Sequence, residues 1–222
     1  MKVVILAGGK GSRISEESAL KPKPMIEIGD KPIIWHIMKL YSYYGYNDFI
    51  ICCGYKGQMI KQYFLNYYMY QTDVCFRLGQ VEAEYYDRQL EPWKITMANT
   101  GLNTLTAGRI LQIRDYIGDD EDFMLTYGDG VSNVNIEELL QFHRQVGHIA
   151  TITTTQPEGR FGTIKYDETT GKIERFKEKA RKDQSWVNAG FMVMNRRIFD
   201  YLGDGSSMLE DMPFEKLTAD HQ

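Results

Sequence analysis

The sequence predicts an α/β fold with a mostly parallel β-sheet flanked by helices. Short apolar runs alternate with helix-like patterns over most of the 222 residues. The first run, residues 3–7, is apolar at consecutive positions, as parallel strands covered on both faces require. A hydrophobic content of 43% is enough for one sizeable core, so we expect a single domain over residues 1–222.

The next elements follow in the same alternation. A helix is predicted from Pro32, because proline fits the first helical turn, and Gly45 can end it. The apolar stripe expected on this helix consists of Ile33, Ile37, Leu40, Tyr41 and Tyr44. Buried strands are then predicted over residues 49–53 and 123–126. The stripe expected on the helix that follows consists of Leu139, Phe142, His143 and Val146.

The last third of the chain has a different pattern of residues. From about Thr151 the sequence is rich in β-forming residues, over 151–155, 162–166 and 188–194, with turn residues between these segments. We expect extra strands here that close one side of a pocket instead of forming an independent domain.

Charge and cysteine content exclude several classes of protein. The net charge is -4 with no long run of like charges, which disfavours a nucleic-acid or anionic-membrane surface. No apolar run approaches the roughly 18 residues of a membrane span, and the first run is too short for a signal peptide. Cys52, Cys53 and Cys75 show no CxxC spacing, so we expect buried free thiols in a reducing cytoplasm.

A glycine-rich loop follows the first predicted strand. It reads Leu6-Ala7-Gly8-Gly9-Lys10-Gly11-Ser12-Arg13. Glycines at the carboxyl end of a strand let backbone N–H groups approach a phosphate chain. The dinucleotide fingerprint does not fit, because Ile14 occupies the position of its last glycine, and the spacing to a Gly-Lys-Ser/Thr of the P-loop is absent.

A second basic motif reads Lys21-Pro22-Lys23-Pro24, and its Lys23, between the two prolines, lies ten residues after Arg13. The prolines fix their own φ angles and bias the preceding residues toward extended geometry, so Lys23 lies on a stiff segment. A stiffly held lysine beside a glycine loop suits a reaction at a triphosphate, where positioning and charge neutralisation provide most of the catalysis.

Together the two motifs resemble the signature of the sugar nucleotidyltransferases, which have a Rossmann-like fold and transfer a nucleotidyl group to a sugar 1-phosphate. Further stretches look like the glucose-1-phosphate cytidylyltransferases of that family, which use CTP and glucose 1-phosphate. These stretches are 31–39, 48–57, 91–93, 100–109, 126–130, 159–162, 176–179 and 187–191. The resemblance therefore covers nearly the whole chain in order.

The resemblance implies a role for each matching residue. The residues that would bind the nucleotide are Leu6, Ala7, Gly8, Gly9, Lys10, Gly11, Ser12, Arg13, Lys23, Thr104, Arg109 and Gly128. Among them, Arg13 would neutralise the leaving pyrophosphate, and Lys23 would contact the α-phosphate. Asp129 would hold Mg²⁺ and complete the catalytic set with Arg13 and Lys23. The residues that would bind the sugar phosphate are Glu178, Lys179 and Asn188.

On this basis the nucleotide-binding part of the domain covers about residues 1–130, and the sugar-phosphate-binding part about 131–222. The attacking sugar phosphate is already ionised near neutral pH, since its second pKa is about 6, so the reaction requires no general base.

Family members continue beyond the position of Gln222, and the resemblance implies a second magnesium-binding aspartate in that part. The family also implies a homo-oligomer, and we expect the tyrosines of residues 41–44 and 63–70 to form a subunit contact.

Other functions stay open at this point. The chain could carry out the same reaction with UTP or dTTP, because uridylyl and thymidylyl transferases share the glycine loop. It could instead be a catalytically weak subunit that binds CTP or a CDP-sugar. A nicotinamide-dependent oxidoreductase is the least favoured alternative, because its fingerprint glycine is missing.

Overall fold

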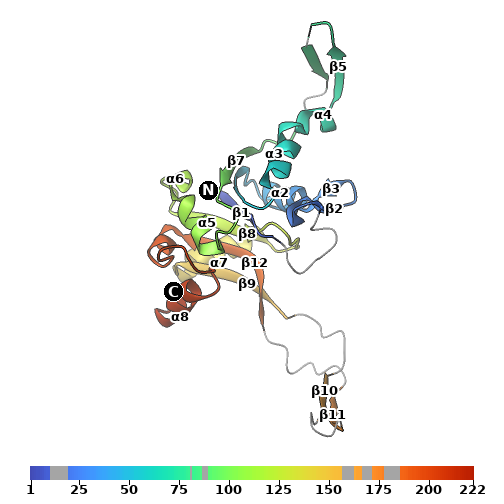
Figure 1. Cartoon of the computed structure of the whole chain (residues 1–222). Helices are drawn as coiled ribbons and strands as arrows, with labels where there is room; N and C mark the ends of the chain where they lie inside the picture. Colours follow the sequence, from blue (N-terminus) through green and yellow to red (C-terminus); the bar gives the residue numbers. More distant parts are fainter. Residues whose placement is uncertain (11–19, 81, 87–89, 157–162, 167–171, 178–185) are drawn as a thin grey trace. The chain divides into compact units, whose positions relative to one another are not determined.

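The computed structural model describes residues 1–10, 20–80, 82–86, 90–156, 163–166, 172–177 and 186–222 (Figure 1). The chain divides into two compact units. The larger consists of Met1–Thr151 with Phe191–Gln222, and the smaller of Ile152–Gly190. The central sheet and most of the helices belong to the larger unit.

The central sheet has six strands in the order β7-β4-β1-β8-β12-β9. Its members in chain order are β1 (Val3–Ala7), β4 (Asp48–Cys53), β7 (Lys94–Asn99), β8 (Asp122–Tyr127), β9 (Ala150–Thr155) and β12 (Val187–Asn195). β4 pairs in parallel with β1 and β7, β1 pairs in parallel with β8, and β12 is antiparallel to β8. The expected mostly parallel sheet is confirmed.

The path of the chain through this sheet creates a switch point beside β1. From β1 the chain moves outward to β4 and β7 on one side, and then crosses to β8 on the other side. In open α/β sheets, ligands bind in the crevice that such a reversal leaves at the carboxyl ends of the strands. The expected site is therefore the end of β1 and β8, after Ala7 and Tyr127.

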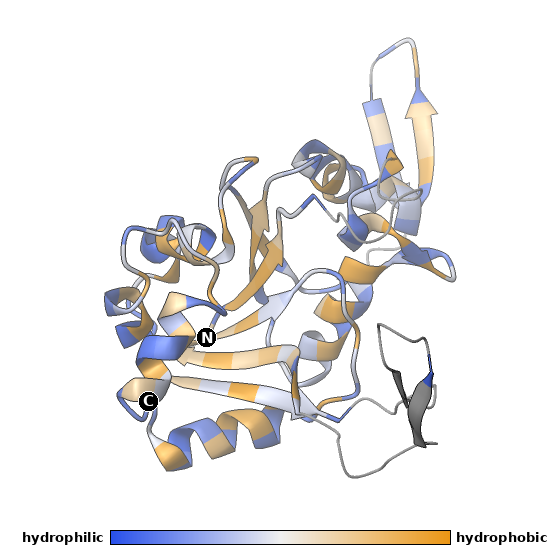
Figure 2. Ribbon diagram, turned by 60° about the horizontal axis from the view of Figure 1, so that its bottom comes forward, coloured by the Kyte–Doolittle hydropathy of each residue, from blue (hydrophilic) through white to orange (hydrophobic). Residues whose placement is uncertain are grey.

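Side chains of β1 alternate between two hydrophobic clusters, one on each face of the sheet. Val3 and Ile5 join a cluster that includes residues of α2, α3 and α7, whereas Val4 and Leu6 join one that includes residues of α5, α6 and α8. Figure 2 shows the strands as the most apolar ribbons of this unit. The helix bounds are α2 (Ile33–Tyr43), α3 (Gly57–Leu65), α5 (Thr106–Gln112), α6 (Arg114–Ile117), α7 (Ile136–Val146) and α8 (Met212–Ala219).

Shorter elements connect these layers. In the larger unit they are η1 (Lys23–Met25), β2 (Glu27–Ile28), β3 (Lys31–Pro32), α4 (Tyr67–Gln71), β5 (Asp73–Arg77), β6 (Glu82–Tyr86) and η2 (Arg196–Asp200). β2 pairs with β3 and β5 pairs with β6, in each case as an antiparallel two-stranded sheet. The smaller unit contains one further antiparallel pair, β10 (Thr163–Tyr166) with β11 (Ile173–Lys177).

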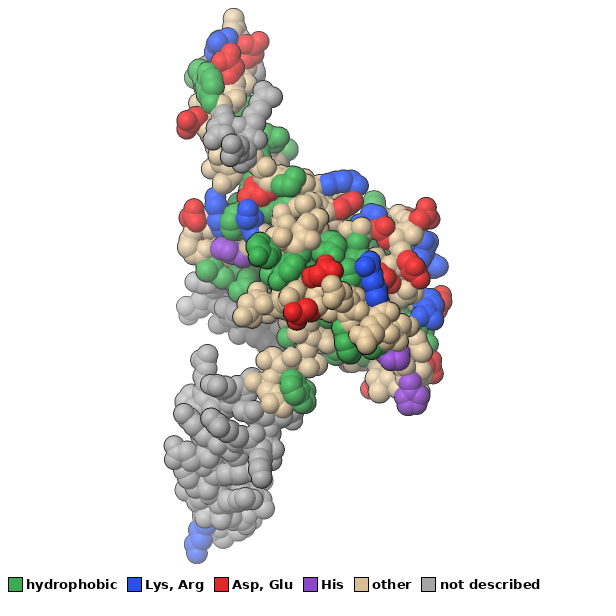
Figure 3. Space-filling view, turned by 180° about the vertical axis from the view of Figure 1, so that it is seen from behind, with side chains coloured by type: hydrophobic (Ala, Val, Ile, Leu, Met, Phe, Trp, Pro, Cys, Tyr) green, Lys and Arg blue, Asp and Glu red, His purple; other side chains and the backbone are tan. Residues whose placement is uncertain are grey.

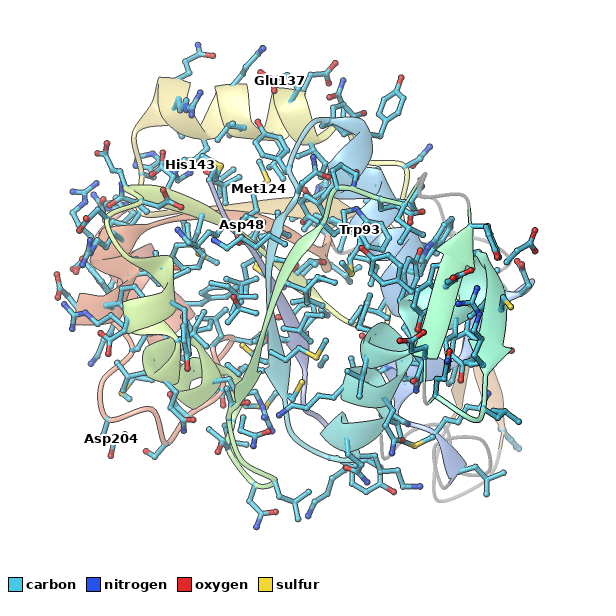
Figure 4. All side chains as sticks on the ribbon, turned by 90° about the horizontal axis from the view of Figure 1, so that it is seen from above. Asp48, Trp93, Met124, Glu137, His143 and Asp204 are labelled. Carbon is cyan, nitrogen blue, oxygen red and sulfur yellow. The ribbon has the colours of Figure 1, made fainter. Side chains whose placement is uncertain are left out.

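The structure corrects three expectations. β9 and β12 were expected as extra strands, but both extend the central sheet. The buried stripe of α7 consists of Ile136, Leu140 and His143, which are spaced by four and three residues and so lie on one face of the helix. Phe142 lies off this face and is 56% exposed. Figure 4 shows His143 on the side of α7 toward the sheet and Glu137 on the side away from it. Cys52 and Cys53 are buried as expected, but Cys75 is exposed.

Among the residues that the structure describes, no helix combines the length and the apolar character needed to cross a membrane. On the face seen in Figure 3, basic and acidic side chains are interspersed. The expectation that the chain binds no nucleic acid stays a prediction.

Phe123 and Phe142 offer a matched test of the core. Phe123 on β8 is fully buried and lies 6.1 Å from the ring of Phe199, whereas Phe142 is exposed. We expect Phe123→Ala to lower the free energy of unfolding by about 3–5 kcal/mol, because it leaves a cavity. Phe142→Ala should change it by less than about 0.5 kcal/mol. Urea unfolding of both variants checks this, and equal effects would contradict the observed orientation of α7.

Candidate functional site

A pocket of about 380 Å³ opens at the carboxyl ends of β1 and β8. Its lining residues are Leu6, Ala7, Gly8, Gly9, Lys23, Pro24, Thr104, Leu105, Thr106, Arg109, Tyr127, Gly128, Asp129, Met208 and Glu210. A hollow of about 550 Å³ is lined by Met1 and residues 120–122, at the amino ends of the same strands. We assign function to the smaller pocket, because ligands of open α/β sheets bind at the carboxyl ends.

Glycine is required where the loops at this edge come closest together. A Cβ added at Gly8 would overlap the guanidinium of Arg109. A Cβ at Gly54 would lie 2.6 Å from both the Gly8 oxygen and Arg109 Nη1. A Cβ at Gly128 would lie 2.9 Å from Pro24 Cγ. At Gly8, Gly54 and Gly128, in the loops that follow β1, β4 and β8, there is therefore no room for a side chain.

Arg109 joins these loops through hydrogen bonds. From α5, its Nη2 donates to the carbonyl of Gly8 at 3.0 Å, and its Nη1 donates to the carbonyl of Gly101 at 2.9 Å. Nη1 also donates to Thr100 Oγ1 at 2.6 Å, and that hydroxyl donates to the carbonyl of Cys53 at 2.9 Å. The side chain is only 4% exposed, so these bonds are made out of contact with bulk water. One guanidinium thus connects the ends of β1, β4 and β7.

This arrangement changes the expectation for Arg109. The resemblance implied that it helps place the nucleotide, and Arg109 does line the pocket. Its guanidinium also donates to oxygens of Gly8, Thr100 and Gly101. The structure thus gives Arg109 a positioning role on the glycine loop, and direct contact with the nucleotide stays a prediction.

Lys23 and Asp129, which the resemblance assigned to the nucleotide site, form an ion pair in the structure. Pro22 has a φ of -67° and a ψ of 146°, which is extended, but Lys23 begins the 3-10 helix η1 and is therefore not extended as the sequence predicted for the residue before Pro24. Lys23 Nζ lies 3.1 Å from Asp129 Oδ2. The pair is placed at one end of the pocket, where Pro24 packs against Gly128. A cation and a carboxylate therefore both face the ligand space.

Several predicted residues lie elsewhere or outside the described part of the chain. Gly11, Ser12, Arg13, Glu178 and Lys179 lie outside the described residues. Lys10 is exposed at the end of the described glycine loop. Asn188 is exposed in the smaller unit, where its Oδ1 accepts a hydrogen bond from the Gly190 N–H at 2.8 Å.

Sequence reasoning missed most of one wall of the pocket, although the resemblance named the adjacent Thr104. This wall contains Leu105 and Thr106 at the start of α5 and Met208 and Glu210 from the segment before α8. Tyr127 also lines the pocket and was passed over as a site residue, although it directly precedes Gly128. Glu210 gives no local signal, because it reaches the pocket only through the packing of residues 207–210 on α5, as in the hydrogen bond from Ala107 N–H to the Ser207 carbonyl at 3.3 Å.

Arg109→Met tests the positioning role. Removing the guanidinium leaves the carbonyls of Gly8 and Gly101 without this donor, which should lower the free energy of unfolding by about 2–4 kcal/mol. Arg144→Met, on the exposed side of α7, is the matched control and should be nearly neutral. Hydrogen exchange at Tyr55, whose N–H donates to the Gly8 carbonyl at 3.0 Å, should rise in Arg109→Met alone. Unchanged exchange there would contradict the role.

Comparison with known proteins agrees with this geometry. The family model described as nucleotidyl transferase matches residues 2–219. Glucose-1-phosphate cytidylyltransferase of Salmonella typhimurium is 46% identical over 217 residues, which cover 98% of this chain and 84% of that protein. Probable glucose-1-phosphate cytidylyltransferase of Bacillus subtilis is 48% identical over 221 residues, 99% of this chain and 85% of that protein.

Solved structures share the fold at lower identity. HddC from Yersinia pseudotuberculosis is similar with a TM-score of 0.65 and 22% identity, over 95% of this chain and 83% of that one. UDP-glucose pyrophosphorylase complexed with UDP-glucose is similar with a TM-score of 0.64 and 16% identity, over 98% of this chain and 87% of that one. The fold, the pocket and the sequence matches together confirm the resemblance: the chain belongs to the nucleotidyl transferase family.

Proposed function

We propose that this chain transfers CMP from CTP to α-D-glucose 1-phosphate, giving CDP-glucose and pyrophosphate. The observation that carries the proposal is the meeting of the glycine loop with Lys23 and Asp129 in one pocket at the switch point. The relatives at 46–48% identity, named as glucose-1-phosphate cytidylyltransferases, supply the choice of substrates.

The reaction joins an oxygen of the sugar phosphate to the α-phosphorus of CTP. The bond from that phosphorus to the bridging oxygen breaks, and the electron pair leaves with pyrophosphate. The attacking phosphate is ionised near neutral pH, since its second pKa is about 6, so no proton has to be removed first. The described lining of the pocket contains lysine, arginine and carboxylate side chains and no histidine, which agrees with a reaction that needs no general base.

Lys23 is the residue placed to stabilise the transition state. Its ammonium, one-fifth exposed on a segment stiffened by Pro22 and Pro24, faces the pocket. Charge grows on the phosphoryl oxygens during transfer, and a cation fixed beforehand stabilises that charge without reorganising. When the triphosphate binds, Lys23 can exchange its pairing with Asp129 for pairing with a phosphate oxygen.

Asp129 is the residue proposed to hold Mg²⁺. The described residues contain no group of three or more histidine, cysteine, aspartate or glutamate side chains that could bind a metal on their own. Mg²⁺ in nucleotide sites is commonly held by one or two carboxylates together with substrate phosphates, so a single exposed carboxylate beside the phosphate end fits an ion that arrives with the nucleotide. Such an ion supplies charge neutralisation on the phosphate oxygens.

We also propose that copies of the chain associate. Tyr43, Tyr68 and Tyr70 are 84%, 53% and 60% exposed, whereas Tyr41 and Tyr67 of the same two clusters are buried. Exposed aromatic side chains are enriched in subunit interfaces. Sedimentation velocity should give a species larger than the 25.8 kDa monomer.

Turnover by the 222-residue chain is the direct test of function. With glucose 1-phosphate and Mg²⁺, pyrophosphate release should be fastest with CTP and much slower with UTP or dTTP. Binding of CTP without release from any nucleotide would instead support a binding-only subunit. Faster release with UTP or dTTP would contradict the choice of base.

A second ion pair provides a matched control for Lys23 and Asp129. Lys94 Nζ lies 3.0 Å from Asp48 Oδ2, close to the 3.1 Å of the Lys23–Asp129 pair, but at the amino ends of β4 and β7. Lys23→Met should reduce kcat by about 10²–10³. Asp129→Asn should raise the Mg²⁺ concentration needed for half-maximal rate. Lys94→Met and Asp48→Asn should leave both quantities unchanged, and an equal loss from the two pairs would contradict these roles.

A further inference from the structure

Glu210 is a carboxylate in the pocket that the proposed reaction does not use. It lines the same space as the glycine loop, and it comes from the segment just before α8. Its Oε2 accepts a hydrogen bond from Thr106 Oγ1 at 3.2 Å, and its Oε1 accepts one from the hydroxyl of Tyr127. Both donors are neutral, so they orient the carboxylate without cancelling its charge.

The contacts group the lining residues into two chemically different sets, which we call the Lys23 end and the Glu210 end. At one end Lys23 lies against Asp129, beside Gly128 and Pro24. At the other end Glu210 and Thr106 hydrogen-bond, and Thr106 Oγ1 also accepts the N–H of Leu209 at 2.6 Å. Leu105 and Met208 line this second end, and each is 41% exposed. The Lys23 end is thus a lysine–aspartate ion pair, and the Glu210 end combines apolar side chains with one carboxylate.

The two ends suit different parts of a nucleoside triphosphate. A triphosphate is repelled by the Glu210 carboxylate and attracted by Lys23, so it occupies the Lys23 end. A pyrimidine base is neutral and planar, and its faces fit the apolar side chains of Leu105 and Met208. Its polar edge then meets Glu210. Each carboxylate oxygen has a lone pair left after the bonds from Tyr127 and Thr106, so Glu210 can accept one more hydrogen bond.

A hydrogen-bond acceptor at this position distinguishes cytosine from uracil and thymine. Cytosine carries a 4-amino group that donates, whereas uracil and thymine carry a 4-oxo group that accepts, and acidic side chains pair with the cytosine amine for this reason. We propose that Glu210 selects cytosine by accepting a hydrogen bond from its 4-amino group. Tyr127 and Thr106 are positioning residues that hold the carboxylate. This inference rests on the proposed nucleotidyl transfer and identifies the residue that determines its base.

Glu210→Gln tests the proposal, because the amide adds a donor that suits a 4-oxo group and keeps the size of the side chain. Affinities for CTP and UTP are measured by calorimetry without sugar phosphate, and rates by pyrophosphate release with it. The CTP-to-UTP ratio should fall about tenfold or more in Glu210→Gln. It should fall less in Tyr127→Phe, which keeps the carboxylate but removes one of the donors that orient it. Glu215→Gln, an exposed glutamate on α8, is the matched control and should keep the wild-type ratio.

The outcomes separate this proposal from the function on which it rests. An unchanged ratio in a folded Glu210→Gln variant overturns the proposal, and so does an equal loss of CTP and UTP, which indicates contact with ribose or phosphate. A raised Mg²⁺ requirement at constant ratio also overturns it and makes Glu210 a metal ligand. If wild type turns CTP over while any of these holds, only base selection fails. If wild type binds neither nucleotide, the proposed function fails as well.

Discussion

The candidate site depends on the buried guanidinium of Arg109, which joins the loops that follow β1, β4 and β7. Its hydrogen bonds fix the carbonyls of Gly8 and Gly101 at the ends of β1 and β7, and through Thr100 they reach Cys53 at the end of β4. These loops lie so close to the guanidinium of Arg109 that a Cβ added at Gly8 or Gly54 would collide with it. The proposed binding of phosphate needs the backbone of the glycine loop in one conformation, and the bond from Arg109 to the Gly8 carbonyl helps to fix it.

The charged side chains of the pocket at this edge of the sheet come from different segments of the chain. The topology places β1 beside β8, so the glycine loop and Asp129 emerge at the same edge from segments far apart in the chain. Lys23, on its proline-stiffened segment, provides the cation, and the segment before α8 provides the opposite wall with Glu210. In the proposed binding mode, the phosphates of the nucleotide point toward Lys23 and its base toward Leu105 and Met208. Orientation of that kind contributes to catalysis by placing the α-phosphorus where the sugar phosphate attacks.

The parts of the fold and of the candidate site that depend on contiguous sequence patterns could be predicted from the sequence. The buried strand at residues 3–7, the glycine loop after it and Lys23 between prolines are contiguous patterns with a direct physical meaning. The family resemblance placed Lys23 and Asp129 in the nucleotide site, and in the structure both line one pocket, whereas their ion pair was not predicted. Glu210 and the loop-binding role of Arg109 could not be predicted, because each depends on contacts between distant segments. Phe142 was expected to be buried because helical periodicity alone does not decide between adjacent apolar faces, and tertiary packing selected Leu140 and His143.

A crystal structure of the chain with CTP and Mg²⁺ tests the central claim most directly. The claim predicts the triphosphate against Gly8 and Gly9, Lys23 moved from Asp129 to a phosphate oxygen, and the base between Leu105 and Met208. A nucleotide bound at the amino ends of the strands, near Met1 and Asp120, would contradict it. So would a triphosphate lying beside Glu210 with the base at Lys23.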